Sequence, residues 1–144
     1  SKEYAKSGNT EIDSIINYKM DLAEQHNIKS KVELKVPEKL NIKSFDLSII
    51  IGNLLDNAIE ASSKAEDKFI NISVELDRSV LYISLYNSYD GNLKFEGGKL
   101  STTKKIEHHG LGLNSVEKSI EKYNGAINIH HDKKVFYVDV LLYN

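Results

Sequence analysis

The chain has 144 residues, enough for one compact domain with its own core. Its net charge of −2, with both signs spread along the sequence, gives no basis for binding nucleic acid or an anionic membrane surface. The absence of cysteine excludes disulfides and thiolate metal sites, and no apolar run approaches the roughly 20 residues of a transmembrane helix. We therefore expect a soluble, cytoplasmic domain.

The beginning of the chain predicts a lead-in segment, a helix and a strand. Residues 1–9 have no apolar period and are expected to come from an upstream segment. Apolar residues then recur at helical spacing up to about His26, and Asn9 or Thr10 is expected to cap this helix. Residues 31–37 alternate as a half-buried strand.

Residues 44–65 form the longest periodic segment and predict a helix capped by Ser44 or Asp46. Two alternating segments follow, 69–77 and 80–87, and predict an antiparallel hairpin.

The remainder predicts a long loop, a helix and a second hairpin. Residues 88–110 are rich in Gly, Ser, Thr, Lys and His, and a loop this long inside a compact domain is either functional, disordered or a misread element. Residues 111–124 have helical spacing, with Gly125 expected as a left-handed cap. Segments 126–131 and 134–143 close the chain as strands. The order favours an α+β fold, a two-layer α/β sandwich in which helices cover one face of a mixed, mostly antiparallel sheet.

Four polar residues interrupt the apolar period of the long helix. Asn53 and Asn57 are four apart and fall at the margin of the apolar stripe, where a cleft could open. Their amide oxygens can bind a cation and their NH₂ groups can donate to phosphate. Asp56 and Glu60 are expected to lie further round, toward solvent. The helix alone favours ordinary surface positions for all four.

The stretch "HHGLGLNSV" places Gly110 and Gly112 where the long loop meets a helix. Glycines there let the backbone approach a ligand, and free amides at a helix start favour an anion. One G-x-G pair is weak support by itself. The stretch "GGKLS" (97–101) is not a phosphate loop, since Leu100 stands where Ser or Thr is required.

Adjacent histidine pairs at 108–109 and 130–131 are expected to be surface residues, because neighbours on a strand point to opposite faces and no third metal ligand is suitably spaced. His109 touches the glycine turn and so lies near any ligand bound there.

Taken together, "NLLDNAIEA" (53–61), a strand pair ending at Asn87, a loop with "TTKK", and "HGLGL" (109–113) resemble the ATP-binding domain of the GHKL superfamily of gyrases, heat-shock chaperones, histidine kinases and mismatch-repair proteins. The resemblance spans about residues 10–142 and is strongest to the catalytic domain of sensor histidine kinases, in particular the peptide-pheromone (AgrC-like) receptors of quorum sensing. It implies the Bergerat ATP-binding fold over residues 10–144, with a lid at about 88–109, and residues 1–9 as a leader from an upstream dimerisation hairpin.

The resemblance also implies roles for individual residues. Asn57 matches the magnesium ligand, and Asn53 matches the position at which hydrolytic relatives carry the glutamate that activates water. An amide cannot act as that base, so the catalytic residue stays unassigned. The implied ATP contacts are Asn53, Asn57, Asn87, Lys104, His109, Gly110, Leu111, Gly112 and Leu113.

Three departures from the family pattern are visible. Asn87 replaces the aspartate that accepts a hydrogen bond from adenine, although Asp90 is a rival for that role. Glu60 replaces a basic residue three positions after the magnesium asparagine, and should face away from phosphate or bind through the ion. The lid lacks an evident phenylalanine motif, for which Phe95 is a weak candidate.

The implied function is transfer of the γ-phosphoryl group of Mg-ATP to a histidine on the upstream dimerisation hairpin, with ATP and Mg²⁺ as cofactors and a response regulator as indirect partner. The domain would belong to a membrane-bound receptor without itself contacting the membrane or nucleic acid. None of the five histidines has the setting of an acceptor. Alternatives are an anti-sigma-factor type serine kinase or other GHKL ATPase, and an interaction domain that no longer binds nucleotide.

Overall fold

The computed structural model describes residues 2–96, 99–101 and 115–144. Its elements are helix α1 (Thr10–Gln25), strand β1 (Lys29–Lys35), helix α2 (Ser44–Ser63), and strands β2 (Phe69–Asp77), β3 (Val80–Ser88), β4 (Lys94–Glu96), β5 (Lys99–Ser101), β6 (Ala126–His131) and β7 (Val135–Tyr143). Residues 115–122 are helical. The predicted order of elements is confirmed, with one correction: the segment predicted as loop contains the β4–β5 hairpin.

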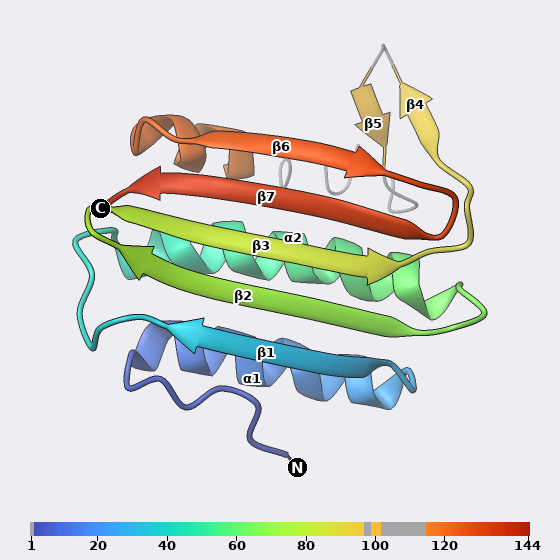
Figure 1. Cartoon of the computed structure of the whole chain (residues 1–144), viewed down its shortest axis with the longest axis horizontal. Coiled ribbons are helices and arrows are strands. Elements are labelled where there is room, and N and C mark those ends of the chain that lie inside the picture. The colour runs from blue at the N-terminus through green and yellow to red at the C-terminus, as the bar shows by residue number, and fades with distance from the viewer. Residues whose placement is uncertain (1, 97–98, 102–114) are drawn as a thin grey trace.

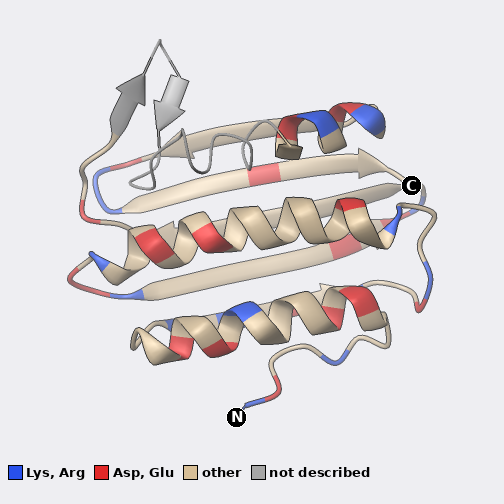
Figure 2. Ribbon diagram, turned by 180° about the vertical axis from the view of Figure 1, so that it is seen from behind, with Lys and Arg blue, Asp and Glu red and all other residues tan. Residues whose placement is uncertain are grey.

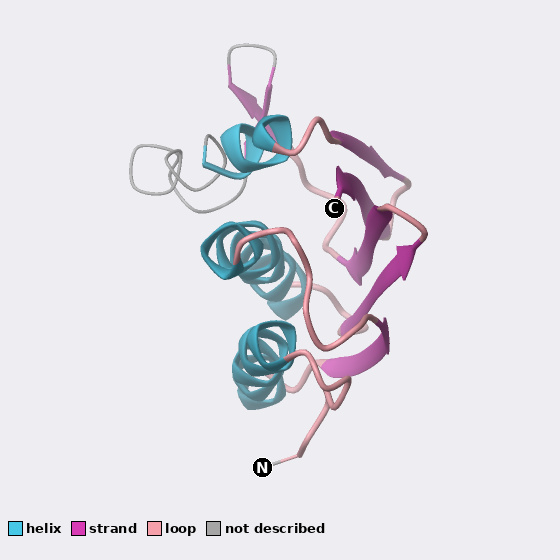
Figure 3. Ribbon diagram, turned by 90° about the vertical axis from the view of Figure 1, so that its left-hand side faces the viewer, coloured by secondary structure: helices cyan, strands magenta, loops and turns pink. Residues whose placement is uncertain are grey.

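Five strands form one sheet in the order β1-β2-β3-β7-β6, in which β1 and β2 are parallel and the other neighbours are antiparallel. Figure 1 shows the open face of this sheet, and Figure 3 shows α1, α2 and helix 115–122 together on the opposite face. The predicted two-layer arrangement, with a mixed and mostly antiparallel sheet covered on one face, is therefore confirmed.

Helix α2 lies in the middle of the helical layer and is buried along most of its length. Its apolar residues pack with those of α1 and of the sheet in a single core. α1 contacts α2 along its length, and an ion pair joins the two, with Lys19 Nζ 2.7 Å from Asp56 Oδ1. Figure 2 shows the two helices side by side, with acidic residues toward both ends of α2.

The N-terminal caps of the two long helices differ. Asn9 caps α1 as predicted, because its Oδ1 accepts from the Ile12 amide at 3.1 Å. The predicted cap of α2 is wrong: Lys43 occupies the cap position, and its side chain makes no capping hydrogen bond. Asp46 is instead committed to a contact with a distant part of the chain.

Asp46 joins the start of α2 to the end of helix 115–122. Its carboxylate accepts a hydrogen bond from the Tyr123 hydroxyl and lies 3.0 Å from Lys122 Nζ. The Tyr123 hydroxyl also accepts from the Lys43 amide at 3.1 Å. Chiefly because Tyr123 donates to it, the Asp46 carboxyl has a pKa below its ordinary value of 3.8. This contact anchors helix 115–122 at the end remote from residues 102–114.

The segment before α1 packs along that helix. Asn17 Oδ1 accepts from the amides of Tyr4 and Ala5, both at 2.8 Å, and Asn17 Nδ2 donates to the Ala5 carbonyl. Ala5 is almost fully buried. The segment is thus held against the domain, and its role as a leader from an upstream hairpin stays a proposal.

The end of helix 115–122 corrects the role expected for Gly125. Asn124, with φ of 52°, adopts the left-handed conformation, whereas Gly125 does not. Gly125 is needed for space: a Cβ atom there would overlap the Leu141 carbonyl oxygen and lie 3.0 Å from Leu142 Cδ2. Glycine therefore permits the close approach of this turn to β7.

We expect Asp46→Asn to lower the free energy of unfolding by about 2 kcal/mol at pH 7, because a buried carboxylate hydrogen-bonded to Tyr123 and Lys122 is replaced by a neutral amide. Since the folded pKa is depressed, this stabilisation is present above the unfolded value of about 3.9 and is lost as the pH falls through the folded value. Urea denaturation of both proteins between pH 7 and about pH 2.5 should show the two curves converging below about pH 4. Curves that stay parallel would contradict the ionic character of the contact, and the exposed Asp139→Asn serves as the control.

Gly125→Ala should destabilise the protein by about 2–3 kcal/mol, because the new methyl group forces the turn away from β7. The matched control is Gly52→Ala within α2, where the added Cβ would meet Ile15 Cδ1 at an ordinary 3.5 Å. That substitution should be neutral or stabilising by up to about 1 kcal/mol. Thermal unfolding measures both, and equal effects would refute the close-approach argument.

Candidate functional site

Two buried serines join the C-terminal end of α2 to the end of β3. Ser62 Oγ lies 2.8 Å from Ser88 Oγ, and the Phe69 amide donates to Ser88 Oγ at 2.9 Å. Asn57 precedes Ser62 by five residues, roughly 7.5 Å along the helix axis, and Asn87 directly precedes Ser88. The serine contact therefore holds the two asparagines at the same end of the domain.

Asn53 and Asn57 are both half-buried on α2, in agreement with their predicted position at the margin of the apolar stripe. Asn53 Nδ2 donates to the Ile49 carbonyl at 2.7 Å, which holds this side chain against its own helix. Within the described residues the structure records no hydrogen bond to the Asn57 carboxamide. Neither the oxygen nor the NH₂ group of Asn57 is therefore taken up by another described residue.

Asn87 is only 2% exposed and continues the alternation of Leu81, Ile83 and Leu85 on the helix-facing side of β3. Its Nδ2 donates to the Ser88 carbonyl at 2.9 Å. With the NH₂ group held in this way, Oδ1 is the part of the amide suited to accept a hydrogen bond.

The rival residue Asp90 has a different environment. It is exposed, and its Oδ1 accepts from the Asn92 amide at 2.9 Å, next to Gly91 with φ of 87°. The Asp90 carboxylate therefore stabilises a turn. Asn87 is thus the buried polar residue at this end of β3, whereas Asp90 belongs to an exposed turn.

Asp56 and Glu60, the two acids of α2 that the sequence predicts to face solvent, are only partly exposed. Asp56 pairs with Lys19 of α1, and Glu60 Oε2 is buried, with no hydrogen-bond partner among the described residues. The physical reason is that α1 packs along one side of α2, so positions outside the sheet-facing stripe are also partly buried.

Several predicted site residues lie outside the described residues: Lys104, His109, Gly110, Leu111, Gly112 and Leu113. The helix predicted to follow the glycine turn is confirmed over residues 115–122, where Val116 and Ile120 are buried in the core. Phe95 lies in β4.

The donor atoms on α2 fit a hydrated divalent cation better than a structural metal. Among the described residues no group of three or more His, Cys, Asp or Glu side chains is placed to hold a metal ion. Mg²⁺ is commonly held by one or two protein oxygens, with the remaining positions filled by water and substrate phosphate. The oxygens on this part of α2 that could serve in that way are those of the Asn57 amide and the Glu60 carboxylate.

The exposed histidines of β6 have aromatic neighbours. His130 stacks on Tyr137 with ring centroids 4.5 Å apart, whereas His131 stacks on Phe136. Tyr137 and Phe136 are successive residues of β7 and face opposite sides of the sheet. The two histidines therefore point to opposite faces, as the sequence predicts.

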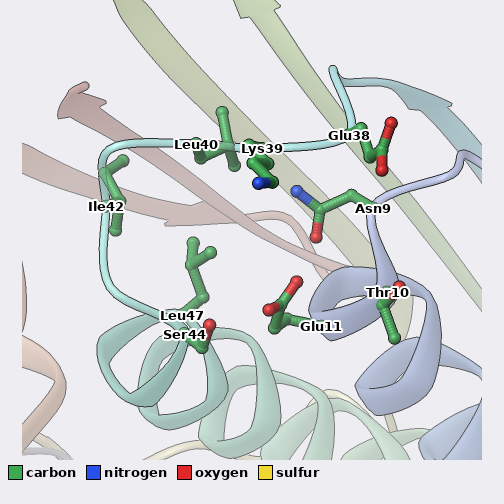
Figure 4. Close-up of a pocket in the computed structure, with 9 residues that line it drawn as sticks. All are labelled: Asn9, Thr10, Glu11, Glu38, Lys39, Leu40, Ile42, Ser44 and Leu47. Atoms are coloured by element: carbon green, nitrogen blue, oxygen red, sulfur yellow. The ribbon is translucent and has the colours of Figure 1, made fainter.

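A pocket of about 310 Å³ lies at the other end of α2 (Figure 4). It is lined by Asn9, Thr10, Glu11, Glu38, Lys39, Leu40, Ile42, Ser44 and Leu47. Ser44 is thirteen residues before Asn57, roughly 20 Å along the helix axis. Two carboxylates against one lysine make this lining unsuited to a polyphosphate, and we assign no ligand to it.

Ser62 and Ser88 are the site residues that sequence reasoning missed. Ser62 falls four residues after Ala58 and seven after Leu55, so it occupies the core-facing period of the helix. A hydroxyl at such a position must find a partner inside the protein. The periodicity therefore indicates that the Ser62 hydroxyl is hydrogen-bonded inside the protein, but which residue is its partner depends on the tertiary fold.

The sequence was compared with known families and proteins. The GHKL domain family matches residues 42–143. A protein of Halalkalibacterium halodurans described as a probable C4-dicarboxylate sensor kinase is 24% identical over 100 residues, which are 65% of this chain and 19% of that protein. The chain thus spans about a fifth of the length of this curated relative.

Solved structures with the same fold include two histidine kinases. The catalytic domain of histidine kinase ThkA has a TM-score of 0.72 and 21% identity, with 96% of this chain and 93% of that chain covered. Acinetobacter baumannii histidine kinase AdeS has a TM-score of 0.68 and 16% identity, with 93% of this chain and 63% of that chain covered.

The match covers well over half of the chain, and the topology of the described residues agrees with it. The chain belongs to the GHKL domain family and has the fold of the ATP-binding catalytic domains of histidine kinases.

Proposed function

We propose that this chain binds Mg-ATP and acts as the catalytic domain of a sensor histidine kinase, transferring the γ-phosphoryl group to a histidine on an upstream dimerisation hairpin. The observation that carries the proposal is the placement of Asn57 on α2 and Asn87 on β3 at one end of the domain, held there by the Ser62–Ser88 contact. Family membership and the sensor kinase relative support the same assignment.

In this proposal Asn87 accepts a hydrogen bond from the adenine amino group through Oδ1, and Asn57 holds the Mg²⁺ ion through its amide oxygen. Mg²⁺ supplies neutralisation of phosphate charge when it is bound. Lys104 and the backbone amides of Gly110, Leu111 and Gly112 are assigned to the phosphates, with His109 and Leu113 beside them.

Asn53 bears on the type of reaction. Its amide has no basic nitrogen or oxygen that could take a proton from water, and its NH₂ group is bonded to the Ile49 carbonyl. A domain without a base at this position suits phosphoryl transfer to a protein side chain, where positioning and charge neutralisation dominate. ATP hydrolysis should therefore be slow.

The finer assignments rest on sequence motifs. The motifs "NLLDNAIEA" and "HGLGL", with Asn87 in the adenine position, favour the peptide-pheromone receptor group of quorum sensing. Such a receptor would lie in the membrane, with this domain in the cytoplasm and a response regulator as the final phosphoryl acceptor. None of the described helices is long and apolar enough to span a membrane.

Asn57→Ala should weaken the binding of Mg-ATP by at least about tenfold, because it removes an oxygen ligand of the ion. Isothermal titration calorimetry measures this, and Asn71→Ala is the matched control, since Asn71 lies on the open face of the sheet and donates to the Tyr86 hydroxyl. Unchanged affinity and magnesium dependence in Asn57→Ala would refute the proposal.

Phosphoryl transfer is tested in the full protein with γ-labelled ATP. Incorporated phosphate should be acid-labile, as expected for phosphohistidine, and absent from Asn57→Ala. Acid-stable phosphate would indicate a serine kinase instead. A wild-type chain that binds no nucleotide would indicate an interaction domain.

Asn87→Ala should lower ATP affinity by about 3- to 10-fold, the effect of losing one uncharged hydrogen bond. It should also reduce the preference for ATP over GTP, because the lost contact is made to the base. Competition binding with both nucleotides measures the ratio, and a thermal melt checks the loss of the bond to the Ser88 carbonyl. Asp90→Ala is the comparison variant: if it, and not Asn87→Ala, changes base preference, the assignment must be exchanged.

A further inference from the structure

Glu60 of α2 has a carboxylate oxygen that is removed from solvent. The residue is half-buried, its Oε2 atom is buried, and no described residue donates a hydrogen bond to that atom. Removing a carboxylate oxygen from water without a compensating partner is unfavourable. In the folded protein, Glu60 Oε2 therefore remains an acceptor to which a bound ligand can supply the missing hydrogen bond.

Among the acids of the described residues, Glu60 shares this situation with Asp21 of α1, whose Oδ1 is also buried without a partner, but not with its neighbour on α2. Asp56, one helical turn earlier, pairs with Lys19 Nζ at 2.7 Å and is neutralised within the protein. The recorded ion pairs of the described residues do not include Glu60. Two acids of the same helix thus differ: Asp56 serves the contact between α1 and α2, whereas Glu60 has one buried carboxylate oxygen without a partner among the described residues.

The position of Glu60 places that charge beside the proposed ligand. Glu60 follows Asn57 by three residues, and side chains so spaced are neighbours on a helix, with Cβ atoms about 5–6 Å apart. Asn57 in turn offers an amide oxygen without a partner among the described residues. One turn of α2 therefore presents two oxygen donors, one neutral and one anionic.

A polyphosphate bound next to an unpaired carboxylate would be repelled unless a cation lay between them. We propose that Glu60 is a second residue holding the hydrated Mg²⁺ ion, together with Asn57. The inference rests on the proposed function, since the ion is the one that accompanies ATP. Mg²⁺ retains several of its water molecules in such sites, so a carboxylate one turn from a direct ligand can accept hydrogen bonds from them.

The test measures how strongly Mg²⁺ and ATP bind together. ATP is titrated calorimetrically into the protein with excess Mg²⁺ and again with a chelator, and the ratio of the two dissociation constants gives the coupling. In Glu60→Gln, which preserves shape and removes charge, this ratio should fall roughly tenfold, the usual effect of losing an outer-sphere partner of a metal. Affinity for metal-free ATP should stay the same or increase, because a repelling charge is gone.

Asp56→Asn is the matched control, because it removes an acid from the same turn that is already paired with Lys19. Its coupling ratio should equal that of the wild type. Thermal melts of both variants without ligand ensure that the comparison is made between folded proteins. If Glu60→Gln unfolds below the temperature at which binding is measured, Glu60→Ser provides the second variant.

Three results separate this inference from the proposed function. If the wild type binds Mg-ATP and loses its coupling in Asn57→Ala but not in Glu60→Gln, the Glu60 inference is wrong and the proposed function stands. Equal losses of affinity with and without Mg²⁺ in Glu60→Gln would likewise overturn it, since Glu60 would then act on the nucleotide or the fold. If the wild type shows no binding of Mg-ATP, the proposed function itself fails.

Discussion

The burial of α2 is the constraint on which the rest of the structure depends. This helix packs on the sheet and against α1, and its fully buried residues include Ile50, Ile51 and Leu55. Each such side chain contributes about 1.5–3 kcal/mol relative to an exposed one, so α2 cannot rotate without a large loss of stability. The orientation of α2 about its own axis in turn fixes the directions in which Asn53, Asn57 and Glu60 project. The apolar face thus positions the polar groups.

Polar contacts at the two ends of α2 complete its placement. At the C-terminal end, Ser62 is joined to Ser88 of β3, and at the N-terminal end Asp46 is joined to Tyr123 and Lys122. Apolar packing specifies which face of a helix is buried, but it resists sliding along the axis less specifically. Directional hydrogen bonds at both ends resist such sliding. They therefore hold Asn57 in register with Asn87.

Period and alternation in the sequence were sufficient to predict the order of elements, the layers of the fold and the placement of Asn53 and Asn57 at a helix margin. The errors have a common cause. Asp46 was taken for a local cap because it stands in the first turn of α2, whereas its partners lie 76 and 77 residues away. The sequence predicts Gly125 as a left-handed helix cap, whereas the structure requires glycine there because a Cβ atom would overlap β7. Long-range contacts of single residues leave no periodic signal.

The distribution of charge at the site follows from desolvation. At Asn87, which is 2% exposed, a carboxylate would lose hydration, and its oxygen would face the Ser88 carbonyl that now accepts from Nδ2. A neutral amide avoids both costs and still offers one acceptor. Glu60 keeps its carboxylate, although Oε2 has no partner among the described residues. The site is therefore neutral where a base would be read and anionic one turn from Asn57. In the proposed function, such an arrangement would make nucleotide binding depend more on the cation than on the base.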